Sequence, residues 1–384
     1  MPYPRYSLAR LLITAVVCSC QPADHRENYS SWETYGGGSG ESIRYSSLNE
    51  INTSNVSRLQ VAWKYSTGDA DTGRNSQIQC NPVIVDGIMY GTSPQLKLFA
   101  LDAATGRERW VFDPGLTVNH AIANNRGVSY WESGEDRRIL YAAGSILYAV
   151  DAGTGRLVED FGDKGQLDLH SGLGERAEKL FVSATSPGVV YQDLIIIGSR
   201  VSEGADAAPG DIRAFNVRTG KLEWVFHTIP RPGEAGYETW EDKEAWKKTG
   251  GANSWAGMSL DLERGIVFVP TGSASPDFYG GARKGANLFA NCILALDAAT
   301  GKLLWHFQTV HHDLWDRDLP GAPSLVTVRR NGREVDALAQ ATKTGFVFLL
   351  ERETGKPLFS VEERKVPAES SLEGEEVWPS QPVP

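Results

Sequence analysis

Residues 98–110 read Leu98-Phe-Ala-Leu-Asp102-Ala-Ala-Thr-Gly106-Arg-Glu-Arg-Trp110 and contain the pattern on which the architecture of this chain rests. The pattern begins with an apolar run that suits a β-strand. Asp102 to Gly106 is typical of a tight turn, because glycine accepts a positive φ and an aspartate side chain bonds to nearby backbone. A second short run then ends in Trp110. The pattern therefore predicts a β-hairpin that ends in a tryptophan.

The same pattern returns four times along the chain. The further copies begin at Leu147, Ile212, Ile293 and Val347. Three of the five copies have a tryptophan eight residues after the first turn position, namely Trp110, Trp224 and Trp305. Another strand pair precedes each copy, as in residues 83–90, so each repeat predicts a four-stranded sheet. Sheets repeated around an axis form a β-propeller, so we expect an all-β fold with these tryptophans buried between sheets and without a chemical role.

The two ends of the repeat array do not match a closed ring. Residues 56–65, which include Trp63, resemble the last strand of a repeat without its beginning. The chain ends in a proline-rich stretch, residues 378–384, in which the sequence indicates no closing strand. We therefore expect residues 46–384 to form an incomplete propeller in which about five blades are present.

Composition excludes several classes of function. The 384 residues carry a net charge of -10 with the acidic residues spread along the chain, so we expect no nucleic-acid partner, which needs a basic face. No apolar run is long enough to span a bilayer as a mature helix. Beyond the N-terminal segment only Cys80 and Cys292 remain, and the chain has no Cys-x-x-Cys-His haem-attachment motif.

The N-terminus has the features of a targeting segment. Residues 1–20 combine a basic start, an apolar middle at residues 11–17 and small residues at the end, as in a secretory signal. Residues 17–20 resemble a bacterial lipobox, which predicts a lipid anchor on Cys20 at the periplasmic side of the cell envelope; a plain signal peptide is the alternative. Residues 21–45 look like a polar tether to the membrane.

The repeat resembles the tryptophan-docking motif of the pyrroloquinoline quinone (PQQ)-dependent dehydrogenases, from about residue 32 to the end of the chain. Residues 125–130, 270–277 and 311–320 are most similar to the glucose dehydrogenase branch. The resemblance implies an eight-bladed-type propeller with PQQ and Ca²⁺ or Mg²⁺ as cofactors. It also implies oxidation of a glucose-like aldose or an alcohol, with a quinone or cytochrome c as electron acceptor.

The resemblance assigns two residues to catalysis. Asp316 corresponds to the general base, because a carboxylate beside a cation stays ionised and can take a hydroxyl proton. Lys343 corresponds to a cation beside the quinone oxygens, where it would stabilise the negative charge that develops on reduction. His311 and His312 are expected to be structural. Taken without the family, both charged residues could be ordinary loop charges.

Four further residues are assigned to the cofactors in the same way. Arg126 resembles the arginine that binds a PQQ carboxylate, for which a bidentate guanidinium is suited. Trp255 resembles the tryptophan on which the quinone stacks. Glu203 and Ser273 fall where relatives carry metal ligands, alongside Asp316. Ser273 departs from the family asparagine, and a hydroxyl is a weaker ligand than an amide carbonyl.

Other functions remain open at this stage. A non-catalytic lipoprotein scaffold of the outer-membrane assembly type has the same class of propeller, although a scaffold has no reason to combine Arg126, Trp255, Asp316 and Lys343. An inactive fragment of an enzyme is a third possibility. Residues 228–251 break the strand pattern, and they either shape access of the substrate or pack on the surface.

Overall fold

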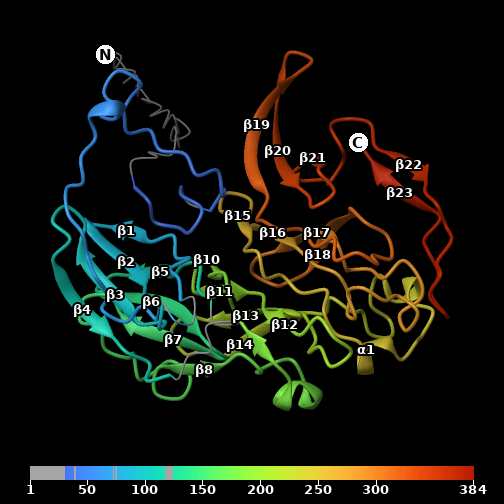
Figure 1. The fold of residues 1–384 in the computed structure, drawn as a ribbon, viewed down its shortest axis with the longest axis horizontal. Helices are drawn as coiled ribbons and strands as arrows, with labels where there is room; N and C mark the ends of the chain where they lie inside the picture. The colour runs from blue at the N-terminus through green and yellow to red at the C-terminus, as the bar shows by residue number, and fades with distance from the viewer. Residues whose placement is uncertain (1–30, 39, 72, 74–75, 117–123) are drawn as a thin grey trace, which may run out of the picture.

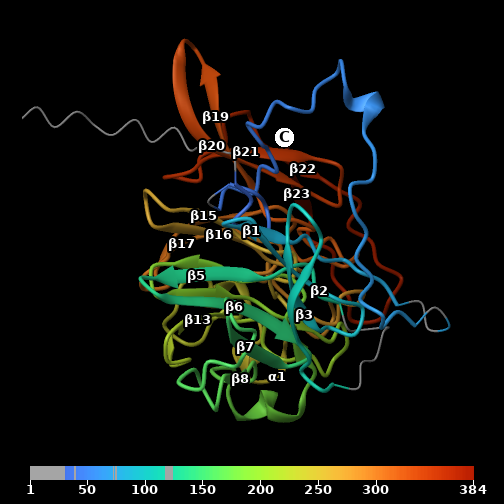
Figure 2. The same cartoon turned by 90° about the vertical axis from the view of Figure 1, so that its left-hand side faces the viewer.

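The computed structural model describes residues 31–38, 40–71, 73, 76–116 and 124–384 (Figure 1). In this part of the chain, four four-stranded antiparallel sheets and one three-stranded sheet follow one another in sequence order. Figure 1 shows them from β1–β4 in cyan to β19–β21 in orange, and Figure 2 shows β5 to β8 side by side within one sheet. The prediction of an all-β fold of repeated sheets is confirmed, while the number of blades in a closed ring stays a prediction.

The strands have the following bounds. The first sheet contains β1 (Val83–Val85), β2 (Ile88–Thr92), β3 (Leu98–Asp102) and β4 (Glu108–Phe112). The second contains β5 (Ser129–Ser133), β6 (Asp136–Ala143), β7 (Ile146–Asp151) and β8 (Gln166–Asp168). The third contains β10 (Val189–Tyr191), β11 (Leu194–Ile197), β13 (Ile212–Asn216) and β14 (Leu222–Phe226). The fourth contains β15 (Ser259–Asp261), β16 (Ile266–Pro270), β17 (Cys292–Asp297) and β18 (Leu303–Gln308). The fifth contains β19 (Ser324–Arg330), β20 (Arg333–Ala341) and β21 (Val347–Glu351).

Short elements lie in the connecting segments. Two small pairs are β9 (Val182–Ser183) with β12 (Arg200–Val201) and β22 (Glu362–Lys365) with β23 (Ser380–Val383). Helical turns occur at Val56–Arg58, Glu175–Lys179, Tyr237–Thr239 and α1 (Ala245–Lys248). The proline-rich end contains a short strand, β23, which among the described strands pairs only with β22 and adds no strand to the five large sheets. Pro382 is tolerated there because each strand of a two-stranded pair has one edge that forms no ladder.

The repeated pattern forms the outer hairpin of the first, third and fourth sheets as predicted, whereas the second and fifth copies continue after the turn only as isolated bridges. In the first sheet, β3 pairs with β4 in the register Leu98 to Phe112. The Asp102 carboxylate accepts from the backbone N–H of Thr105 at 3.0 Å, and Gly106 takes a φ of +69°. Aspartate and glycine therefore make this turn for the reasons that the sequence indicated.

The tryptophans at the ends of the repeats join neighbouring sheets. Trp110 Nε1 donates to the carbonyl of Ala152 at 3.1 Å, and a Cβ placed on Gly155 would meet its ring at 2.7 Å. The same contact recurs at two other sheet boundaries, from Trp224 to Ala298 and from Trp305 to Arg352, and Trp63 makes it to Ala103 of the first sheet. Trp63 docks in this way although its segment forms no strand in the described structure. The interpretation of these residues as packing residues is confirmed.

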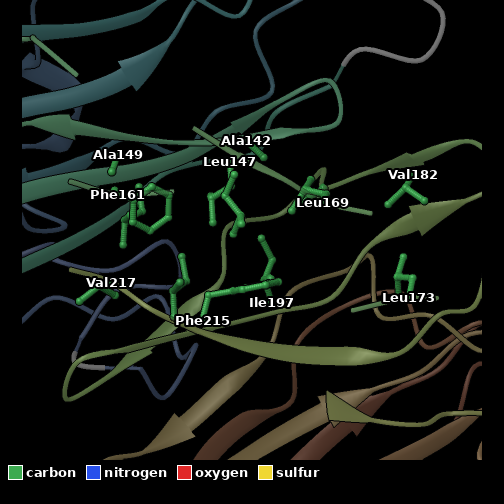
Figure 3. Packing of buried hydrophobic residues seen from close by; sticks show 14 of the residues in the cluster. Ala142, Leu147, Ala149, Phe161, Leu169, Leu173, Val182, Ile197, Phe215 and Val217 are labelled. Atoms are coloured by element: carbon green, nitrogen blue, oxygen red, sulfur yellow. The ribbon is translucent and has the colours of Figure 1, made fainter. Parts of the chain in front are cut away.

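Apolar cores lie between consecutive sheets. Figure 3 shows the core between the second and third sheets, where Leu147 and Ala149 of β7 face Ile197 and Phe215. Three similar clusters fill the boundaries between the first and second, the third and fourth, and the fourth and fifth sheets. The second, third and fourth sheets thus bury both of their faces by stacking on two neighbours, which is the arrangement expected for repeat architectures.

The N-terminal segment is not a loose tether where the structure describes it. Trp32 accepts a hydrogen bond from the Ile84 N–H of β1 at 2.7 Å. Gly40 accepts from Leu260 of β15 at 3.0 Å, and Glu41 accepts from Leu325 of β19 at 2.9 Å. The boundary of the tether at residue 45 stays a prediction, while Trp32, Gly40 and Glu41 are held by the edges of three first strands.

The targeting assignment lies outside the described residues. Residues 1–30, which contain the predicted signal and Cys20, are not among them. In the part of the chain that is described, no helix has the length and apolar character needed to cross a membrane. The lipid anchor and the periplasmic location stay proposals.

Gly301→Ala is expected to lower the stability of the propeller more than Gly87→Ala does. Both glycines have a positive φ, of +71° and +75°, so each alanine costs roughly 1–2 kcal/mol of backbone strain. The added Cβ at residue 301 would also meet the Trp224 ring at 2.4 Å, whereas nothing lies within 4 Å at residue 87. Overpacking adds about 1–3 kcal/mol, so the thermal unfolding midpoint should fall further for Gly301→Ala. Equal midpoints would show that tryptophan docking does not stabilise the fold.

Candidate active site

Five of the predicted site residues line one cavity of about 230 Å³. They are Arg126, Glu203, Trp255, Asp316 and Lys343. The remaining lining residues are Asn124, Thr185, Arg200, Val201, Ser202, Asn253, Ser275, Asp277 and Asp318. The cavity wall is therefore almost entirely polar.

The topology of the sheets explains why distant residues meet here. Arg126 and Trp255 lie just before the first strands β5 and β15. Lys343 lies between the second and third strands of its sheet, and Asp316 lies between β18 and the next first strand, β19. In an antiparallel sheet of four strands, these connections all emerge at the same end. The cavity is thus built from loops at one end of successive sheets.

Asp316 and Lys343 form a hydrogen-bonded ion pair. Lys343 Nζ lies 2.7 Å from Oδ1 of Asp316 and also donates to the Asp316 carbonyl at 3.0 Å. The two side chains are 31 % and 32 % exposed, so the pair faces the cavity without being sealed from water. Asp316 takes a φ of +51°, a strained conformation of the kind that collects at functional sites.

Arg126 and Trp255 make the wall on another side. The guanidinium lies 5.3 Å from the centre of the Trp255 ring, which is a cation–π contact. Its Nη1 is buried and has no hydrogen-bond partner in the structure. Burial lowers the pKa of Arg126, as expected for a cation removed from water, and the nearby cation of Arg200 lowers it further. The arrangement suits an anionic ligand that would supply the missing partner.

The cavity also concentrates negative charge. The pKa of Asp277 is raised to about 8, chiefly by burial and then by three neighbouring carboxylates. These carboxylates belong to Asp318, Asp316 and Glu203. A bound cation would relieve this repulsion, and carboxylate oxygens are the ligands that Ca²⁺ and Mg²⁺ prefer. Among the described residues, however, no three His, Cys, Asp or Glu side chains are already arranged around a metal position.

Comparison with known proteins identifies the family. Residues 32–384 match the family model described as PQQ: glucose/ethanol/alcohol dehydrogenase, β-propeller domain. The chain belongs to the PQQ-dependent dehydrogenase family.

Relatives of this quinoprotein propeller are dehydrogenases. It is 36 % identical to the quinate/shikimate dehydrogenase (quinone) of Acinetobacter baylyi, over 94 % of this chain and 47 % of the relative. It is 36 % identical to the quinoprotein glucose dehydrogenase of Gluconobacter oxydans, over 96 % of this chain and 48 % of the relative. The crystal structure of quinohemoprotein alcohol dehydrogenase from Comamonas testosteroni superposes with a TM-score of 0.74 at 28 % identity, covering 91 % of this chain and 52 % of that one. The chain thus spans about half the length of these relatives, and they give no support to the scaffold alternative.

Ser273 is the one predicted site residue of the quinoprotein that the structure does not bring to the cavity. It is 2 % exposed and its hydroxyl donates to the Asp313 carboxylate. The same hydroxyl accepts from Asn291 Nδ2 at 3.3 Å. Because its oxygen is directed into this buried network, Ser273 is not arranged as a metal ligand. Asn253 and Ser275, from adjacent positions of the wall, reach the cavity instead.

The two histidines of the quinoprotein motif have local partners. His312 is buried, and its Nδ1 lies 2.9 Å from the Gly285 carbonyl. Nδ1 of His311 lies 2.6 Å from Gln308 Oε1, and Nε2 lies 3.1 Å from Glu363. Neither histidine lines the cavity in the described structure, in keeping with the expected structural role.

Sequence interpretation missed two acidic members of the site, Asp277 and Asp318. Each stands in a stretch that carried the family resemblance, residues 270–277 and 311–320. A sequence signal was thus present, because Asp318 follows the predicted base by two residues.

The charged insertion packs on the surface of the quinoprotein. Trp240 is 1 % exposed and lies in a small apolar cluster with Ile229, Ala245 and others. None of the described residues that line the cavity lies within residues 228–251. Of the two alternatives for this segment, the structure favours surface packing over a direct part in access to the cavity.

Proposed function

We propose that this chain is the cofactor-binding, catalytic part of a dehydrogenase that oxidises a hydroxyl group of a glucose-like aldose or an alcohol. The electrons would pass to a quinone or a cytochrome c. One observation carries the proposal: Arg126, Trp255, Asp316 and Lys343, which are far apart in sequence, meet around a single polar cavity. A non-catalytic scaffold does not require that combination.

The cavity residues fit PQQ. This cofactor is a flat ring system with three carboxylates, and when bound it accepts the two electrons of the oxidised hydroxyl group. The buried, unpartnered Nη1 of Arg126 suits one carboxylate, and the Trp255 indole offers an aromatic surface for stacking. Lys343 would present its ammonium group to the quinone oxygens.

The acidic side of the cavity fits a hard divalent cation. Glu203 and Asp316 would hold Ca²⁺ or Mg²⁺ through carboxylate oxygens. Burial is the main cause of the raised pKa of Asp277, and the neighbouring carboxylates, whose charge such a cation would neutralise, add to it. Ser273 has no part in this proposal, because its hydroxyl is bound to Asp313.

Asp316 is the group that would take the proton of the substrate hydroxyl. Lys343 Nζ binds Oδ1 of this carboxylate at 2.7 Å, which fixes its direction and leaves Oδ2 for the proton. Proton transfer to a positioned carboxylate in the transition state is general base catalysis. The Lys343 ammonium holds the base in place at the same time as it faces the cavity.

Binding of PQQ tests the proposed function. With Ca²⁺ present, the chain is expected to bind PQQ in equilibrium dialysis and to reduce a redox dye with a member of an aldose and alcohol panel. Arg126→Gln should weaken PQQ binding by about 10–100-fold, because it removes a hydrogen bond between charged groups. Arg137→Gln, on the exposed part of β6, serves as the matched control and should bind as the parent does. Absence of PQQ binding at micromolar concentration would contradict the proposed function.

A further inference from the structure

Asp318 connects three parts of the cavity wall. Its Oδ2 accepts a hydrogen bond from Trp255 Nε1 at 2.7 Å, and its Oδ1 accepts from the backbone N–H of Ser273 at 2.6 Å. Lys343 Nζ lies 4.0 Å from Oδ2. Both carboxylate oxygens of Asp318 therefore accept hydrogen bonds from N–H groups of the wall, and the carboxylate lies next to the ion pair of Asp316 and Lys343.

The loop that faces Asp318 leaves space for its carboxylate at Gly272. A Cβ placed on Gly272 would approach Oδ1 to 2.5 Å, so any other residue there would push the loop away. Burial raises the pKa of Asp318 above its usual range, which is the expected response of a carboxyl group that is largely removed from water. A buried carboxylate is tolerated when N–H donors satisfy it, and hydrogen bonds to an ionised group are the stronger kind.

Trp255 is held at both its backbone and its ring. Its carbonyl accepts from the hydroxyl of Ser186 at 2.8 Å and from that of Thr185 at 3.2 Å. These bonds fix the backbone but leave rotation about the side-chain bonds free. Arg126 contacts the ring from one side at 5.3 Å, and the bond from Nε1 to Asp318 adds a directional restraint on the indole plane.

We propose that Asp318 is a positioning residue, which holds the indole of Trp255, through Nε1, in the orientation on which the quinone stacks. The inference rests on the proposed function, because it concerns the aromatic surface proposed for PQQ. The role of Asp318 differs from that of Asp316, although both belong to one motif. Asp316 would accept the proton of the substrate hydroxyl, and Asp318 would orient the indole ring on which the quinone stacks.

The first test needs no cofactor. Indole N–H signals of the ¹⁵N-labelled chain are recorded by NMR, and the signal that is lost in Trp255→Phe identifies Trp255. In Asp318→Asn that signal should move upfield, because the indole loses an ionised acceptor, while the other indole signals stay in place. An unchanged Trp255 signal would overturn the inference.

The second test is a double-mutant cycle on PQQ affinity. Trp255→Phe and Asp318→Asn should each raise the Kd of PQQ by about tenfold, since each removes the same charge-assisted hydrogen bond. The double variant should also lie near tenfold, whereas independent effects would multiply to about a hundredfold. Ca²⁺ affinity in the absence of PQQ should stay at the parent value.

The outcomes separate this inference from the proposed function. Multiplicative losses, or a loss of Ca²⁺ affinity in Asp318→Asn, would overturn the positioning role and leave PQQ binding by the parent intact. A parent chain that binds no PQQ would overturn both proposals. Thermal midpoints show whether each variant is folded, and if Asp318→Asn is not, an unchanged Kd in Trp255→Phe alone still contradicts the inference.

Discussion

Asp316→Asn is expected to lower kcat of the PQQ- and Ca²⁺-loaded protein by about 10²–10⁴-fold, the usual contribution of general base catalysis. Asparagine keeps the size of the side chain and one oxygen for a cation, but it cannot take the proton of the substrate hydroxyl. The carboxyl group is placed for that role by Lys343 at 2.7 Å and by a backbone held at a φ of +51°. The measurement is dye-linked turnover with the best substrate of the panel, together with the Kd of PQQ, which should change little.

Asp206→Asn is the matched control for this prediction. Asp206 lies in the same loop as Glu203, but it is exposed, accepts from Ser202 Oγ at 2.8 Å and does not line the cavity. It should turn over as the parent does. Turnover close to that of the parent in Asp316→Asn would assign the base to another carboxylate of the cavity, of which Asp277 is the more buried and Glu203 the more exposed.

The architecture was predictable because its determinants are local and repeated. The turn at Asp102 to Gly106 and the tryptophan that follows it act within one hairpin, and each copy strengthens the same interpretation. Docking of each tryptophan on the next sheet follows from that repetition, since the glycine of the next turn leaves room for the ring.

The sequence did not predict backbone contacts between segments that lie far apart along the chain. Residues 32–41 are polar and glycine-rich, which is typical of a tether, yet they bond to the first strands of three sheets. Those strand edges come together only after the sheets have stacked, so the segment itself carries no signal of its partners.

For the candidate site, the loop in which a residue lies was easier to predict from sequence than the direction in which its side chain points. Ser273 stands in the expected loop, but its hydroxyl is turned to Asp313, and only the buried network around it explains that orientation. Asp318 belongs to the motif that supplied the base, and its bond to Trp255 joins the loops that lie before and after the fourth sheet. Family resemblance names the residues of a motif, while the geometry decides which of them face the cavity.

Lys343→Met is expected to lower kcat by about 10²–10³-fold, the size of effect seen when one group that stabilises developing charge is removed. Methionine keeps the length of the side chain but loses the ammonium that faces the cavity and bonds to Asp316 at 2.7 Å. Lys343→Arg should recover part of the turnover, because it restores the charge with a different geometry of donors.

The thermal stability of the same variants shows whether the loss of kcat comes from the reaction itself or from a less stable fold. Ion pairs that are as exposed as this one, at 31 % and 32 %, contribute about 0–1 kcal/mol to folding, so the thermal midpoint of Lys343→Met should hardly move. Lys356→Met, an exposed lysine just after the turn of the fifth repeat, controls for the loss of a surface charge and should retain full turnover. A fall in midpoint that matches the fall in kcat would show that Lys343 stabilises the loop of Asp316 and does not act on the reaction, whereas a large fall in kcat at a constant midpoint places its ammonium group in the chemistry.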